Sequence, residues 1–311
     1  MNRYDKLLKR IQNGETILID GGTGTEVERR GVPQTKNAWN AGGSLTHPDI
    51  VRQIHEDFIN KGSEIVISNT FATSKHLMKD AECLDDFEKI NCRSVELAVE
   101  ARNNSKNPNA LVAGGISHWS FTNILPSLDE LKEGAMEQAS IMKNAGADLI
   151  MLEMMIDIPR MLAVYEGAKT SNLPIWVGLS CEPDKERVMR LLGGQKDLYD
   201  STPNSRIGQT LEEAIMALND TNVPLLSIMH TDVAYIDQCL EIVGQHWNRF
   251  VGIYAHSGDD INMKWTFDDV ISPQDYTNFC KKWINYNLSI IGGCCGTGPE
   301  HICDLKKNLF N

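Results

Sequence analysis

The segment Ile290–Pro299 reads IIGGCCGTGP and is the most informative stretch of the chain. The apolar run Leu288–Ile291 is typical of a buried strand, and the glycines after it allow the backbone to turn sharply. Cys294 and Cys295 stand at that turn, where two thiolates can reach one soft metal ion. A disulfide between adjacent cysteines would be strained. The alternative is a pair of buried thiols in an apolar turn, because a metal site needs further ligands.

Similar apolar runs recur along the whole chain, separated by enough residues for a helix. They are rich in Ile, Val and Leu and alternate little with polar residues, as expected for strands buried on both faces. The eight predicted strands are Ile17–Asp20, Glu64–Asn69, Ala110–Ile116, Leu149–Glu153, Pro174–Cys181, Pro224–His230, Phe250–His256 and Leu288–Cys294.

Helical periodicity fills several of the gaps between these strands. The predicted helices are Pro48–Lys61, Phe87–Asn103, Leu128–Ala145, Pro159–Thr170, Leu211–Leu218, Ala234–Val243 and Ser272–Asn285. Repeated strand–helix units in 311 residues predict an α/β fold, a single (β/α)₈ TIM barrel that spans residues 1–311 as one domain. The alternative is an open doubly wound sheet, for which the turn Gly21–Gly24 carries only part of the dinucleotide-binding fingerprint. Residues 197–208 are predicted to form a surface loop.

The composition narrows the class of function. The chain has 42 acidic and 30 basic residues and a net charge of −12, which argues against non-specific nucleic-acid binding and against anionic membranes. It contains no secretory signal and no apolar run long enough to cross a membrane. The eight cysteines follow no small-domain disulfide pattern. A cytoplasmic protein with reduced thiols is therefore expected. The sequence leaves the oligomeric state open, and a homo-oligomer is one of the possible states.

In a barrel, functional side chains gather at the carboxyl ends of the strands. Three protein ligands with one open position are the pattern of a catalytic zinc site. His230 is the best third ligand for the cysteine pair, His256 is the next, and Cys181 is a further option. The alternative for each histidine is a hydrogen-bonded structural role, which is commoner for a lone histidine at a strand end.

Other residues at the strand ends suit a small substrate. Two carboxylates, Asp20 and Glu153, match an ammonium group, and the turn at Gly21 offers backbone N–H groups to a carboxylate or phosphate. Ser68 and Asn69 end the second predicted strand. The structural alternatives are that Asp20 caps the glycine turn and that Glu153 pairs with a nearby Lys or Arg.

These motifs together resemble the homocysteine S-methyltransferase family, which includes the betaine–homocysteine methyltransferases. The resemblance covers nearly the whole chain and rests on Ile19–Thr25, Asn69–Phe71, Glu153, Tyr254–Gly258 and Gly292–Gly296. It implies a single barrel in which three cysteines hold zinc and leave one position for the sulfur of homocysteine. Two of the three match Cys294 and Cys295, and the carboxylates that contact the amino acid part of homocysteine match Asp20 and Glu153.

The chain departs from this family at several positions. The first zinc cysteine of the family is replaced by His230, so the predicted ligands are His230, Cys294 and Cys295, and a metal other than zinc is also compatible with this set. The tyrosines of betaine-using members are replaced by Ala72 and Met154. Trp39 and Trp119 are left to offer aromatic faces to the donor, with simple packing as the alternative for each. His256 is a further candidate substrate contact, and the alternatives for it are a metal ligand or a residue that supports one.

The resemblance implies a zinc-dependent reaction between two small molecules, a thiol and a methyl donor. The donor is a betaine, a thetin-type sulfonium or S-methylmethionine, and the acceptor is homocysteine, which becomes methionine. The alternatives are a related methyltransferase with another acceptor and a metal-free barrel that binds small ligands.

Overall fold

The computed structural model describes residues 1–122, 124–192, 208–258, 260–261, 264–265 and 270–310. Eight parallel strands form one sheet in the order β1-β12-β9-β8-β5-β4-β3-β2. A parallel bridge between Ile19 and Ile65 joins the two ends of this order and closes the sheet into a barrel. The strands are β1 (Ile17–Leu18), β2 (Ile65–Ile67), β3 (Leu111–Ile116), β4 (Leu149–Met155), β5 (Ile175–Leu179), β8 (Leu225–Asp232), β9 (Phe250–His256) and β12 (Ile290–Gly293).

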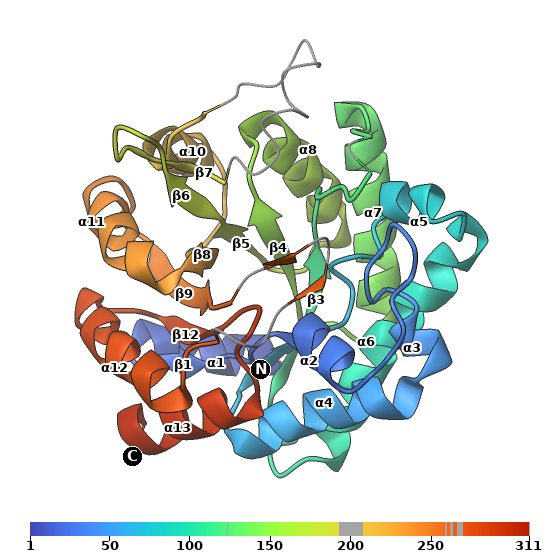
Figure 1. Cartoon of the computed structure of the whole chain (residues 1–311), viewed down its shortest axis with the longest axis horizontal. Helices are drawn as coiled ribbons and strands as arrows, with labels where there is room; N and C mark the ends of the chain where they lie inside the picture. The colour runs from blue at the N-terminus through green and yellow to red at the C-terminus, as the bar shows by residue number, and fades with distance from the viewer. Residues whose placement is uncertain (123, 193–207, 259, 262–263, 266–269, 311) are drawn as a thin grey trace.

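Figure 1 shows the helices arranged as a ring around these strands, so the predicted (β/α)₈ barrel is confirmed and the open sheet is excluded. The helices are α1 (Arg3–Gln12), α2 (Thr23–Arg29), α3 (Gly43–Thr46), α4 (Pro48–Lys61), α5 (Lys75–Asp80), α6 (Phe87–Asn104), α7 (Leu128–Ala145), α8 (Ile158–Ala168), α10 (Leu211–Asn219), α11 (Ile236–His246), α12 (Pro273–Trp283) and α13 (Pro299–Leu309). None of the helices in the described part of the chain is both long and apolar enough to span a membrane.

Local sequence signals explain why the helices begin and end where they do. The hydroxyl of Ser127 accepts a hydrogen bond from the Glu130 amide at 3.2 Å, and the Glu130 carboxylate accepts one from the Ser127 amide at 2.8 Å. This capping box satisfies free N–H groups at the start of α7. Gly146 ends the helix in a left-handed conformation with φ of 106°, which costs glycine little.

The strands bury both faces, which explains their lack of alternation. Ile17 and Ile19 point into the barrel, whereas Leu18 between them packs against the outer helices. Helix α1 covers the amino-terminal end of the barrel, where Trp176 donates a hydrogen bond to the Tyr4 hydroxyl at 3.1 Å. Access to the interior is therefore left to the opposite end, where the carboxyl ends of the strands lie.

The structure corrects some predicted boundaries. The fifth strand ends at Leu179, and Cys181 begins a separate hairpin of β6 (Cys181–Pro183) and β7 (Met189–Leu191). Cys181 packs in the apolar layer between sheet and helices, away from the predicted metal ligands. Helix α13, directly after the cysteine motif, was not predicted. The predicted surface loop at 197–208 lies outside the described residues except for Gly208.

His55 of α4 gives the fold a specific sensitivity to acid. Its side chain is fully buried, and neither ring nitrogen has a hydrogen-bond partner in the described parts of the chain. Burial lowers its pKa from 6.5 to about 4, so the folded state favours the neutral ring. The unfolded state therefore gains a proton first as the pH falls through 6.5, and stability is lost until the pH reaches about 4.

Between pH 7 and pH 4 this titration lowers the free energy of unfolding of the wild-type protein by about 3 kcal/mol. We expect His55→Leu, which has no imidazole at this position, to lack this decrease. Urea unfolding of both proteins at several pH values measures it, and the stability of His55→Leu relative to wild type should rise by this amount as the pH falls. Parallel curves across this range would contradict the assignment to His55.

Candidate active site

A cavity of about 570 Å³ opens at the carboxyl ends of the strands. It brings together nine of the residues predicted from the sequence: Gly21, Trp39, Ser68, Asn69, Trp119, Glu153, His230, Cys294 and Cys295. Asp20 and His256 are not among the residues that line it. Asp20 lies behind the wall, where its carboxylate accepts a hydrogen bond from the Ile67 amide at 2.7 Å. His256 packs against His230, with ring centroids 4.5 Å apart.

One imidazole and two thiols form a compact cluster in the wall of this cavity. Cys294 Sγ lies 3.6 Å from His230 Nδ1 and 4.0 Å from Cys295 Sγ. One potential ligand atom from each of the three residues lies within 4.8 Å of the others. Strands β8 and β12 are separated by β9 in the sheet, so the cluster depends on the barrel to bring its two parts together.

A break in the regular pairing of β8 aims His230 at the cysteines. The register between β8 and β9 shifts between Met229 and Asp232, and His230 has a left-handed backbone with φ of 41°. Irregular pairing of this kind re-aims side chains near functional sites. A non-glycine residue in this region costs free energy and persists only where its surroundings hold it.

Strand β4 has a matching irregularity beside Glu153. The register between β4 and β5 shifts between Leu152 and Met155, and Met154 has φ of 54°. The Met154 amide points to the sulfur of Met229 at 3.1 Å, which couples the two irregular segments. Glu153 and His230 thus reach the cavity from strand ends that both depart from regular sheet geometry.

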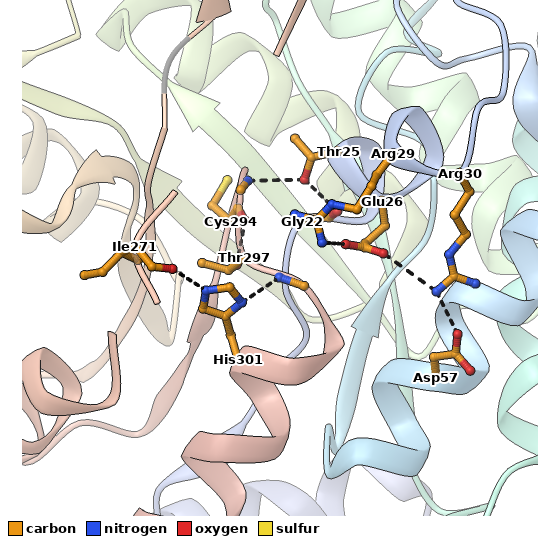
Figure 2. A network of polar contacts seen from close by, with 12 residues as sticks. Gly22, Thr25, Glu26, Arg29, Arg30, Asp57, Ile271, Cys294, Thr297 and His301 are labelled. Carbon is orange, nitrogen blue, oxygen red and sulfur yellow. Dashed lines mark hydrogen bonds and ion pairs between the residues drawn. The ribbon is translucent and has the colours of Figure 1, made fainter. Parts of the chain in front are cut away.

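The loop that carries the cysteines is tied to the glycine turn after β1, as Figure 2 shows. The Thr297 hydroxyl donates to the Cys294 carbonyl at 2.6 Å, and the Gly22 amide donates to the Thr297 carbonyl at 2.8 Å. The Thr25 hydroxyl accepts from the Gly296 amide at 3.2 Å and donates to the Gly22 carbonyl at 3.0 Å. These bonds fix the backbone from which the thiols project.

The contacts in Figure 2 continue outward and make this loop part of the scaffold. His301 accepts a hydrogen bond from the Gly298 amide at 3.1 Å and donates to the Ile271 carbonyl at 2.8 Å, as a neutral ring does. Burial lowers the pKa of His301, in keeping with this role. Glu26 pairs with Arg29 at 2.6 Å on the other side of the turn. His301 is therefore structural.

The two thiols differ in their readiness to ionise. The hydrogen bond from Cys294, together with the nearby His230, lowers the pKa of Cys295 to about 5 in spite of its burial. The same contact with Cys295, together with burial, raises the pKa of Cys294. Without a metal, Cys295 is therefore a thiolate that is stabilised by the thiol of Cys294. This thiolate is electron-rich and suited to bind a cation.

The carboxyl group of Glu153 is held in its neutral form when the cavity is empty. Burial, followed by the charges of Asp20 and Cys295, raises its pKa to about 8. Burial also raises the pKa of Asp20 well above its ordinary value. Neither group has an ion-pair partner among the described residues, so an ammonium group in the cavity would stabilise the charged form of Glu153, which lines it.

Several cavity residues were not predicted from the sequence. They include Asn40 and Phe121, together with residues 34–37. Tyr254 was considered only as part of the motif Tyr254–Gly258, yet it lines the cavity, and its buried hydroxyl has no hydrogen-bond partner among the residues the structure describes. The loop at 34–40 follows no strand directly, so the rule of strand ends did not point to it.

Residues 17–309 match a family model described as homocysteine S-methyltransferase. The chain therefore belongs to the homocysteine S-methyltransferase family and is a methyltransferase.

Characterised proteins resemble the chain over most of its length. It is 24% identical to selenocysteine Se-methyltransferase of Brassica oleracea var. italica, with 98% of this chain and 92% of the relative covered. It is also 24% identical to betaine–homocysteine S-methyltransferase 1 of Bos taurus, covering 97% and 74%. The metallated form of the homocysteine methyltransferase MmuM from Escherichia coli has a similar fold, with a TM-score of 0.77, 20% identity and coverage of 97% and 99%.

Gly22 provides a direct test of the contact between the glycine turn and the cysteine loop. A Cβ atom at this position would lie 2.4 Å from the Thr25 hydroxyl oxygen and 2.7 Å from the Cys294 carbonyl oxygen. We expect Gly22→Ala to destabilise the fold by about 1–3 kcal/mol and to weaken metal binding, because the loop must move. Gly244→Ala is the matched control, since a Cβ there meets nothing within 4 Å. Thermal unfolding and metal titration measure both variants, and equal behaviour would contradict the packing argument.

Proposed function

We propose that the protein moves a methyl group from a small onium donor to the thiol of homocysteine, giving methionine, with zinc held by His230, Cys294 and Cys295. The observation that carries this proposal is the placement of the imidazole–thiol cluster and of Glu153 in the wall of one cavity. The cavity can therefore bind both ends of homocysteine, its sulfur at a soft metal site and its amino group at a carboxyl group.

The geometry of the cluster fits zinc. A tetrahedral zinc ion with ordinary bond lengths separates two sulfur ligands by about 3.8 Å, and a sulfur and a nitrogen ligand by about 3.6 Å. The corresponding separations here are 4.0 Å between the two Sγ atoms and 3.6 Å between Cys294 Sγ and His230 Nδ1. Three protein ligands leave one position for a substrate atom, as in catalytic sites. When bound, zinc would lower the pKa of a thiol that takes this position.

The side chains of the cavity bind and orient the acceptor. Glu153, in its ionised form, accepts hydrogen bonds from the ammonium group. The largely apolar strand ends restrict water around the sulfur. In the reaction a carbon–sulfur bond forms to the methyl group, the bond from methyl to the donor nitrogen or sulfur breaks, and its electron pair stays on that atom.

The relatives differ in the methyl acceptor for which they are named, so they do not identify the acceptor of this protein. One relative is named for selenocysteine and another for betaine and homocysteine. We propose homocysteine because the cavity combines a site for sulfur with a carboxyl group for an amine. An acceptor assay with homocysteine, cysteine and selenocysteine decides between them, and transfer to the other two alone would overturn the choice.

Metal analysis tests the ligand set. We expect one zinc per chain in the purified protein and at least a tenfold loss of affinity in His230→Ala, since a catalytic site keeps only three protein ligands. His246→Ala is the control, because this histidine lies on α11 outside the cavity. His230→Cys should restore binding by completing a set of three thiolates. Wild-type protein that binds no zinc or related metal would exclude the proposal.

Proton release on ligand binding tests Glu153. Methionine carries the ammonium group without a thiol, so its binding at pH 6.5 should ionise Glu153, whose pKa is about 8 in the empty cavity, and release close to one proton. The release should fade as the pH rises above 8, where Glu153 is already ionised. Calorimetry in buffers of different ionisation enthalpy measures it, and Glu153→Gln should abolish it. Unchanged release in that variant would assign the proton to another group.

A further inference from the structure

The loop at residues 34–40 forms one wall of the cavity and is held in a strained conformation. Two of its non-glycine residues have left-handed backbones, Asn37 with φ of 60° and Trp39 with φ of 43°. The Thr35 amide donates to the Trp39 carbonyl at 2.5 Å, and the Thr35 hydroxyl accepts from the Gly42 amide at 3.0 Å. Strain of this kind persists only where the surrounding structure holds it, as these hydrogen bonds do here.

The ring of Trp39 is fixed in place within this wall. Its Nε1 donates to the Glu28 carboxylate at 3.0 Å, and its ring meets Phe71 edge to face with centroids 6.4 Å apart. A Cβ atom on Gly24 would lie 2.4 Å from the ring, so a glycine is required beneath it. Trp119 and Phe121 line the same cavity as a second edge-to-face pair, with centroids 6.2 Å apart. Aromatic faces of this kind attract onium groups.

Few of the described residues that line the cavity carry a charge. Within this described lining, Lys36 is the one lysine or arginine and Glu153 is the one carboxylate. Glu153 is buried, whereas Lys36 is exposed at the rim and makes no ion pair within the described part of the chain. A donor that enters past Lys36 therefore meets a positive charge before it reaches the aromatic rings.

We propose that Lys36 makes the enzyme select zwitterionic donors, which carry a carboxylate as well as the onium group. The ammonium group of Lys36 attracts the carboxylate and repels a donor whose only charge is positive. The aromatic side chains of the same cavity receive the onium end. This inference rests on the proposed function and assigns Lys36 as a residue that determines donor specificity.

Two sulfonium ions isolate the role of the carboxylate. Dimethylsulfonioacetate is a zwitterion, and trimethylsulfonium is a bare cation with the same reacting group. In each case the homocysteine sulfur loses its proton to solvent and forms a bond to the methyl carbon, while the methyl–sulfonium bond breaks and leaves its electron pair on the donor sulfur. The products besides methionine are methylthioacetate from the first donor and dimethyl sulfide from the second.

The test compares kcat/KM for both donors in wild-type protein, in Lys36→Met and in Lys36→Arg. We expect Lys36→Met to lower kcat/KM for dimethylsulfonioacetate about fivefold to tenfold, mainly through KM, as for loss of a partly exposed charged contact. Trimethylsulfonium should be used equally well or better, and Lys36→Arg should keep the wild-type preference. Lys132→Met, an exposed lysine of α7 outside the cavity, is the matched control.

Binding measurements keep this inference separate from the proposed function. Quenching of tryptophan fluorescence reports binding of glycine betaine and of tetramethylammonium without any turnover. Absence of methyl transfer from every donor would overturn the proposed function, while selective loss of glycine betaine binding in Lys36→Met would still support the role of Lys36. If Lys36→Met changed the binding of glycine betaine and of tetramethylammonium equally, or changed neither, the proposed role of Lys36 would be wrong.

Discussion

The pairing of the first barrel strand with the last is the constraint on which the site depends. Ile17 and Leu18 of β1 pair with Ile290 and Ile291 of β12. Two hydrogen-bonded loops continue from this pair, the glycine turn and the cysteine loop, and the Gly293 amide donates to the Asp20 carbonyl at 2.9 Å. The thiols are thus positioned by contacts between segments about 270 residues apart, such as the bond from the Gly296 amide to Thr25, which joins residues 271 apart.

Four of the eight non-glycine residues with left-handed backbones in the described part of the chain line the cavity. His230 and Trp39 have left-handed backbones, and the segment after Glu153 has one at Met154. The rest of the barrel pairs in a regular parallel register, apart from the shifts in β4 and β8. The free-energy cost of these conformations is met by a well-packed core, which is the usual relation between a functional site and its scaffold.

The sequence predicted the fold well because strands buried on both faces leave long apolar runs that few other structures produce. It predicted the cluster of His230 with the two cysteines for a similar reason, since strand ends converge in any barrel. It did not predict residues 34–37 as cavity lining, because their place depends on a loop held by tertiary contacts such as that of Trp39 with Glu28. It also predicted that Asp20 and Glu153 would both contact the substrate, although of the two only Glu153 lines the cavity.

The closure of the barrel also sets the order in which this site can come into being during synthesis. The carboxyl group of Glu153 and the imidazole of His230 leave the ribosome long before Cys294 and Cys295. Until β12 has been made and paired with β1, the glycine turn lacks its partner loop and the cavity lacks one wall. A nascent chain therefore carries separate, weakly binding groups until β12 has paired with β1.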